Sequence, residues 1–131
     1  MISTKSLMIL MTILLWVIFG LHLGALHFAW YWTYWWFDIP MHFLGGAWLG
    51  GMAILALRKW APEKTEKKVI VYTTAIVVAL FIGGVWELFE FSLDTFVIMR
   101  VNDIADTITD FGMDVAGALS AALLIMGKSK N

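Results

Sequence analysis

The stretch SLMILMTILLWVIFGLHLGALHFAWYWTYWWF, residues 6–37, decides the fold class of this chain. Its 32 residues include no Asp, Glu, Lys or Arg. About 20 apolar residues cross the hydrocarbon core of a bilayer, so the stretch predicts a transmembrane helix. A cleavable signal peptide is the competing interpretation, but no small-residue cleavage motif is evident, and we expect a retained helix.

The whole chain has the composition of a membrane protein. It is 61% hydrophobic and has a mean hydropathy of +0.82. Further apolar runs follow the first one, and we expect helices at about 6–26, 39–57, 69–91 and 104–126. The predicted fold is therefore an all-α, polytopic four-transmembrane-helix bundle, with residues 1–131 forming a single integral membrane domain.

The last of these helices must carry acidic residues into the membrane. Its uncharged part, 115–127, has 13 residues and covers only about 20 Å of a ~30 Å core. A spanning helix therefore includes Asp110 and, we expect, Asp106. A carboxylate that faces lipid costs at least a few kcal/mol, so these side chains should face the bundle interior or a water-filled cavity.

The basic residues predict the orientation. Eight of the nine fall on one side of the predicted bundle, in the 58–68 connection and at the two chain ends, and Arg100 is the exception. The positive-inside rule then places both termini in the cytoplasm (N-in/C-in). The aromatic segment 30–37 lies on the other side, where an interfacial belt is a simpler interpretation than a ligand-stacking platform.

Most acidic residues gather on that other, non-cytoplasmic side, at helical spacings. Asp38 and His42 are four residues apart, and Glu87 and Glu90 are three apart, so each pair shares a helix face. On the last helix, Asp103, Asp106, Asp110, Asp114 and Gly117 fall within an arc of about 80°. Such a stripe is what a buried polar seam requires, with the glycine leaving room for a neighbouring helix.

So many carboxylates inside a membrane require either protonation or bound cations. Carboxylates with an imidazole suit Mg²⁺, Mn²⁺, Fe²⁺ or Zn²⁺, and the spacings resemble those of di-metal carboxylate bundles, although the Glu-x-x-His motif of those bundles is missing. We therefore predict a divalent metal ion as the cofactor, of a kind that the sequence does not identify. The predicted metal ligands are Asp38, His42, Glu87, Glu90, Asp106, Asp110 and Asp114.

Other interpretations compete for some of these residues. Helix capping explains Asp38 and Asp103 as well as metal binding does. Two histidines of the first helix, His22 and His27, are about 140° apart, which favours packing or interfacial roles over metal ligation. Cysteine is absent, which excludes disulfides, thiolate ligands and thiol nucleophiles.

Three sequence blocks resemble one family. They are Asp38-x-x-x-His42-Phe43-x-x-Gly46, then Glu87-Leu88-x-Glu90 followed by an aromatic residue, then Asp103-x-x-Asp106-Thr107-x-x-Asp110 with Gly117 seven residues later. In order and spacing they resemble the YjdF-type bacterial inner-membrane proteins over residues 37–119. The last helix has a weaker likeness to VanZ-like membrane proteins. The resemblance implies a membrane fold, in a bacterial or archaeal cytoplasmic membrane, with recurrent polar residues and no particular reaction.

Three functions follow from these observations. The leading hypothesis is a metal site near the non-cytoplasmic face that supports chemistry on a lipid-linked substrate entering from the bilayer, with catalytic residues unassigned. The alternatives are a cation or proton transporter and a membrane scaffold with a buried polar network. The expected partner is the lipid bilayer and not nucleic acid, and the sequence leaves open whether copies form a homo-oligomer.

Overall fold

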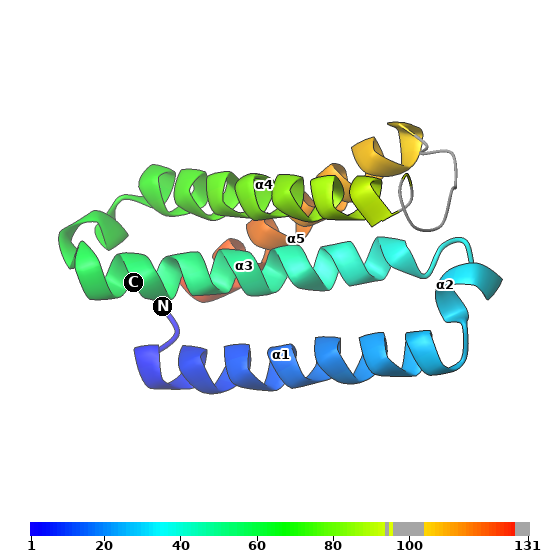
Figure 1. Cartoon of the computed structure of the whole chain (residues 1–131). Helices are drawn as coiled ribbons and strands as arrows, with labels where there is room; N and C mark the ends of the chain where they lie inside the picture. Colours follow the sequence, from blue (N-terminus) through cyan, green and yellow to red (C-terminus); the bar gives the residue numbers. More distant parts are fainter. Residues whose placement is uncertain (94, 96–103, 128–131) are drawn as a thin grey trace.

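The computed structural model describes residues 1–93, 95 and 104–127. Within these residues the chain is helical and forms no strand. The helices in chain order are α1 (Thr4–His27), α2 (Trp30–Thr33), α3 (Asp38–Trp60), the 3₁₀ helix η1 (Pro62–Glu66), α4 (Lys68–Leu93) and α5 (Ile104–Met126) (Figure 1).

Four of these helices are long and apolar enough to cross a membrane, namely α1, α3, α4 and α5. They contain 24, 23, 26 and 23 residues, and each expected helix end lies within three residues of the observed one. The all-α, four-helix membrane fold predicted from the sequence is therefore confirmed. The short α2 and η1 were not predicted.

Local signals fix where the first long helices begin and end. Ser3 caps α1, because its hydroxyl accepts a hydrogen bond from the Ser6 amide at 3.1 Å. The chain then turns at Ala29, which has a left-handed backbone with φ of 58°. The N-cap of α3 is Phe37, and Asp38 lies in the first helical turn. The N-cap interpretation of Asp38 is therefore wrong. The Asp38 carboxylate instead lies 3.7 Å from His42, one helical turn further along the chain.

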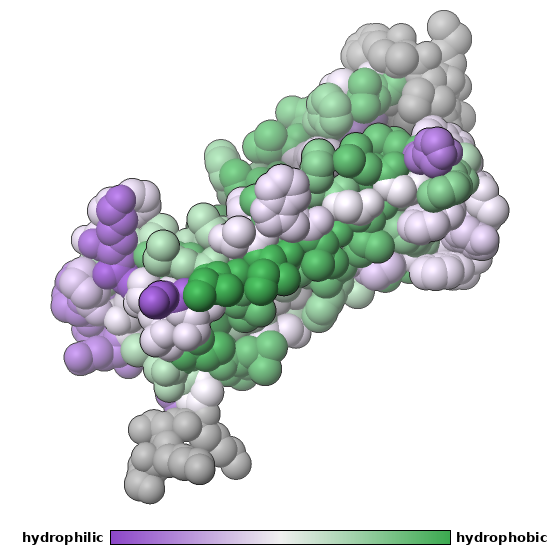
Figure 2. Space-filling view, turned by 90° about the horizontal axis from the view of Figure 1, so that it is seen from below, coloured by the Kyte–Doolittle hydropathy of each residue, from purple (hydrophilic) through white to green (hydrophobic). Residues whose placement is uncertain are grey.

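The long helices run side by side, with α3 at the centre. In Figure 1, α3 lies between α1 and α4, α5 lies behind them, and both chain termini lie at the same end as η1, opposite α2. Figure 2 shows hydrophilic side chains concentrated mainly at one end of the bundle and a largely hydrophobic surface along its length. Exposed residues such as Leu10, Phe81 and Leu124 form part of this surface, as expected for helices in contact with lipid.

Helices α3 and α5 approach each other through glycines. A Cβ atom on Gly46 would overlap the backbone of Asp114, and one on Gly117 would overlap the carbonyl oxygen of Phe43. On Gly50, a Cβ would come within 2.8 Å of the Ala118 Cα. This contact holds the facing side chains of α3 and α5 within reach of one another, which positions the polar cluster described next.

Candidate metal centre

His42 on α3 is the centre of the polar cluster. The residue is only 7% exposed. Its Nε2 atom lies 3.7 Å from Asp38 Oδ2, 3.8 Å from Glu87 Oε1 and 3.9 Å from Asp110 Oδ1. These three carboxylates come from α3, α4 and α5, so one imidazole edge faces acidic groups from three helices.

The other imidazole nitrogen pairs with a fourth carboxylate. His42 Nδ1 lies 3.4 Å from Oδ1 of Asp114, which is 3% exposed. A Cβ atom on Gly83 of α4 would overlap Asp114 Oδ2, so this glycine makes the space that the carboxylate occupies. An Nδ1–H group donated to Asp114 leaves the Nε2 lone pair directed at the other three acids, the arrangement found around metal-ligating histidines.

The distances on the Nε2 side are too long for hydrogen bonds but suit a shared ion. Two atoms that each lie about 2.1 Å from one ion, at an angle of roughly 110–140°, are about 3.4–3.9 Å apart. His42, Glu87 and Asp110 form one set of three potential ligands, and Asp38, His42 and Glu90 form a second. In the first set, Glu87 Oε1 and Asp110 Oδ1 are buried and have no hydrogen-bond partner.

The remaining predicted ligands lie closer to the surface. Glu90 is half-buried and belongs to the second set with Asp38. Asp106 is exposed and belongs to neither set. The structure therefore gathers five of the other six predicted residues around His42 and leaves Asp106 at the edge, while Asp103 and Arg100 lie outside the described residues.

Comparison with known proteins identifies the family. The family model described as "Predicted membrane protein (DUF2238)" matches residues 2–131. The chain belongs to the DUF2238 family. No curated protein and no solved structure matches it.

Sequence reasoning missed two groups that shape the acidic cluster of this DUF2238 protein. The Thr107 side chain on α5 lies close to the Glu87 carboxyl group. Gly83 provides the space for Asp114 and lies four residues before Glu87, on the same face of α4. The four-residue spacing of Gly83 and Glu87 could have predicted that Gly83 faces the cluster. The position of Thr107 could not be predicted, because it depends on how α4 and α5 pack.

Tyr31 connects the aromatic segment of the DUF2238 chain to the cluster. Burial raises the pKa of Tyr31 to about 12, and the negative charges of Asp38 and Glu90 add to this effect. Its hydroxyl lies 2.9 Å from Nδ1 of His22, on α1. In contrast, Trp32 and Trp35 of the same segment are exposed, as expected for an interfacial belt. His22 therefore contacts Tyr31 and belongs to neither set of potential metal ligands.

Proposed function

We propose that α3, α4 and α5 bind one divalent cation between His42 Nε2, Glu87 Oε1 and Asp110 Oδ1. One observation carries the proposal: these atoms converge within 3.9 Å of the imidazole, and both carboxylate oxygens are buried with no hydrogen-bond donor. Buried acceptors without donors are costly, and a cation offsets that cost.

The ligand types favour particular ions. An imidazole nitrogen together with carboxylate oxygens suits Mn²⁺, Fe²⁺ or Zn²⁺ better than Mg²⁺, which prefers oxygen ligands and bound water. Asp114 would orient the imidazole through Nδ1, and Asp38 and Glu90 would add negative charge beside the ion without binding it directly. Three protein ligands leave open coordination positions, as in catalytic metal sites.

We further propose that this centre serves chemistry on a lipid-linked substrate. The Asp38 side chain is 29% exposed and Glu90 is half-buried, so both carboxylates are partly accessible from outside the bundle. A bound divalent ion there would polarise a phosphoryl oxygen or activate water. The partly exposed Asp38 and Glu90 carboxylates would orient such a substrate or accept a proton from water.

Transport has less support. Toward the end that carries the termini, the bundle core of the described residues consists of apolar side chains. The buried residues there include Leu7, Ile54, Val71, Ala122 and Ile125. An ion crossing this layer would meet no ligand, which makes conduction through the bundle unfavourable.

The three blocks of residues at 38–46, 87–91 and 103–117 support the finer assignment of this chain to the YjdF type within its family. The likeness to VanZ-like proteins stays a prediction. A bacterial or archaeal cytoplasmic membrane likewise stays the proposed location.

Metal analysis of the purified full-length protein tests the cation site. After incubation with Mn²⁺ or Zn²⁺ and removal of free ion, the wild-type chain should retain about one ion. Glu87→Gln and Asp110→Asn should each weaken binding by at least tenfold, because each removes one negative ligand. Glu63→Gln and Glu66→Gln are matched controls, because both residues lie exposed in η1 at the other end and should leave binding unchanged.

The same variants separate metal binding from a scaffold role. If the wild-type chain retains no ion and Glu87→Gln and Asp110→Asn fold with unchanged stability, the polar cluster only fixes helix packing. Ion flux into liposomes separates catalysis from transport: a metal-dependent enzyme gives no flux above that of empty liposomes.

A further inference from the structure

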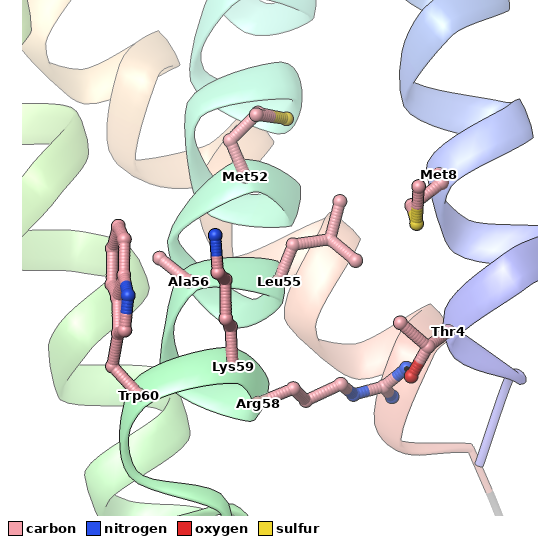
Figure 3. Close-up of a pocket in the computed structure, with 8 residues that line it drawn as sticks. All are labelled: Thr4, Met8, Met52, Leu55, Ala56, Arg58, Lys59 and Trp60. Atoms are coloured by element: carbon pink, nitrogen blue, oxygen red, sulfur yellow. Dashed lines mark hydrogen bonds between the residues drawn. The ribbon is translucent and has the colours of Figure 1, made fainter.

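A second polar feature lies at the opposite end of the bundle, away from the acidic cluster. A groove of about 460 Å³ runs between α1 and α3. Figure 3 shows Arg58 reaching from α3 toward Thr4 on α1, with Lys59 and Trp60 beside it and Met8 and Met52 farther along the groove.

Arg58 is incompletely hydrogen-bonded. Its Nη1 atom donates to the Ile2 carbonyl oxygen at 3.0 Å and to Thr4 Oγ1 at 3.5 Å. Its Nε and Nη2 atoms are buried and have no hydrogen-bond partner. Within the part of the chain that the structure describes, no carboxylate pairs with this guanidinium.

The unpaired edge of Arg58 has the geometry for an anion. The Nε–H and one Nη2–H point the same way and bind two oxygens of a phosphate or carboxylate together. Arg58 lines the groove, and a rotation about the terminal torsions of its side chain would turn this buried edge toward an anion there. The neighbouring Lys59 is exposed and adds a second positive charge, with its Nζ 5.4 Å from the centre of the Trp60 ring.

The rest of the groove suits acyl chains. Met8 is 56% and Met52 39% exposed, and with Leu55 they continue the groove along the helices as an apolar surface. Trp60 is 75% exposed at the end of α3, where tryptophan anchors helices at the headgroup level. Free phosphate would use only the basic residues, whereas a phospholipid would also cover this apolar surface.

We propose that the groove between α1 and α3 binds an anionic phospholipid, with its phosphate on Arg58 and Lys59 and an acyl chain along Met8, Met52 and Leu55. Basic pockets between transmembrane helices bind lipid headgroups in this way. The site is independent of the metal centre. An anionic lipid in this groove would also neutralise part of the positive charge at this end of the bundle.

Native mass spectrometry of the delipidated full-length chain tests this site, with phosphatidylglycerol and phosphatidylcholine of equal chain length as probes. One phosphatidylglycerol should bind at least about tenfold more tightly than phosphatidylcholine. Arg58→Gln should remove this preference, and Lys59→Gln should weaken it about threefold. Lys64→Gln is the matched control, because Lys64 is exposed on η1 and does not line the groove.

Three results would overturn the proposal. The first is equal binding of the two lipids to the wild-type chain. The second is equal phosphatidylglycerol binding by the wild-type, Lys59→Gln and Lys64→Gln chains, which decides the matter even if Arg58→Gln does not fold. The third is displacement of the lipid by millimolar inorganic phosphate, which would make the groove a site for free anions.

Discussion

His42 is surrounded by more negative charge than one imidazole can balance. Four carboxylates lie 3.4–3.9 Å from its two nitrogens. Coulomb repulsion among carboxylates at such separations is strong wherever water is excluded, and a divalent cation offsets it more effectively than a single proton does. Individual residues around the cluster should therefore report whether an ion is bound.

Tyr31 is one such reporter. The pKa of its phenol, raised to about 12 by burial and by the charges of Asp38 and Glu90, should fall when a cation neutralises those charges. A pH titration of phenolate absorbance, taken as the difference between the wild-type chain and Tyr31→Phe, should have its midpoint near 12 without metal and a lower midpoint with Mn²⁺ or Zn²⁺. An unchanged midpoint at saturating metal would mean that no ion binds beside Asp38 and Glu90.

The shift of Tyr31 also sets the direction of a pH effect on stability. The folded chain keeps the phenolic proton to a pH of about 12, whereas the unfolded chain loses it near 10.0. The stability that Tyr31 contributes is therefore complete below pH 10.0 and is lost as the pH rises toward 12. Denaturant unfolding in detergent should show a steeper loss of stability over this interval for the wild-type chain than for Tyr31→Phe.

The sequence predicts which residues share a helix face better than it predicts which residues they contact. The four-residue spacing of Asp38 and His42 places both on one helix turn, and the structure brings them to 3.7 Å. The arc on the last helix contains Asp106 as well as Asp110, yet only Asp110 is buried. A helical projection gives the angle of a residue around its helix axis but not whether a neighbouring helix covers that residue. The sequence alone therefore could not show that Asp110 is buried and Asp106 is exposed.

The pairing of α3 with α5 determines the geometry of the cluster. Gly46 and Gly117 let the two backbones approach, and this brings Asp110 and Asp114 to His42. In lipid such close packing supplies much of the free energy of helix association, because no hydrophobic effect drives helices together there. Enlarging either glycine should therefore disturb stability and the cluster together.

Adjacent glycines on α3 offer a matched test. A Cβ at Gly46 would overlap the Asp114 backbone, whereas a Cβ at Gly45 has no atom within 4 Å. Gly46→Ala should lower the free energy of unfolding by about 1–3 kcal/mol, as overpacked cores do. Gly45→Ala should leave it unchanged or raise it by up to about 1 kcal/mol, since alanine favours helix. Unfolding in mixed micelles measures both, and equal effects would contradict the close α3–α5 contact.

The long helices could be predicted because each is predominantly apolar over enough residues to span a membrane, even where acidic residues interrupt the last one, and their ends agree with the structure to within three residues. The short α2 and η1 could not, since one turn of helix leaves no periodic pattern. The four-residue spacing of Gly46 and Gly50 is typical of helices that pack closely in membranes. Which helix they meet depends on the tertiary arrangement, and the structure identifies it as α5.

The whole molecule has two different ends. The end that carries the termini and η1 contains the groove lined by Arg58 and Lys59. The other end contains the acidic cluster. An apolar core separates them. The proposed cation site and the proposed lipid site therefore lie at opposite ends of the bundle.

The cysteine-free sequence allows the orientation to be measured directly. We predict that Lys64→Cys reacts with a membrane-impermeant maleimide only in inverted membrane vesicles, and Thr33→Cys only in intact spheroplasts, because the positive-inside rule places η1 in the cytoplasm. Both residues are exposed, so labelling should be complete on the accessible side. The opposite pattern would place the acidic cluster on the cytoplasmic face.

The proposed divalent cation lies between His42 Nε2, Glu87 Oε1 and Asp110 Oδ1. Anomalous diffraction from crystals of the full-length protein soaked in Mn²⁺ or Zn²⁺ examines that point directly. We predict a single strong anomalous peak about 2.1 Å from all three atoms, absent in Glu87→Gln. A wild-type crystal with no peak there, and with the Glu87 and Asp110 side chains directed apart, would contradict it.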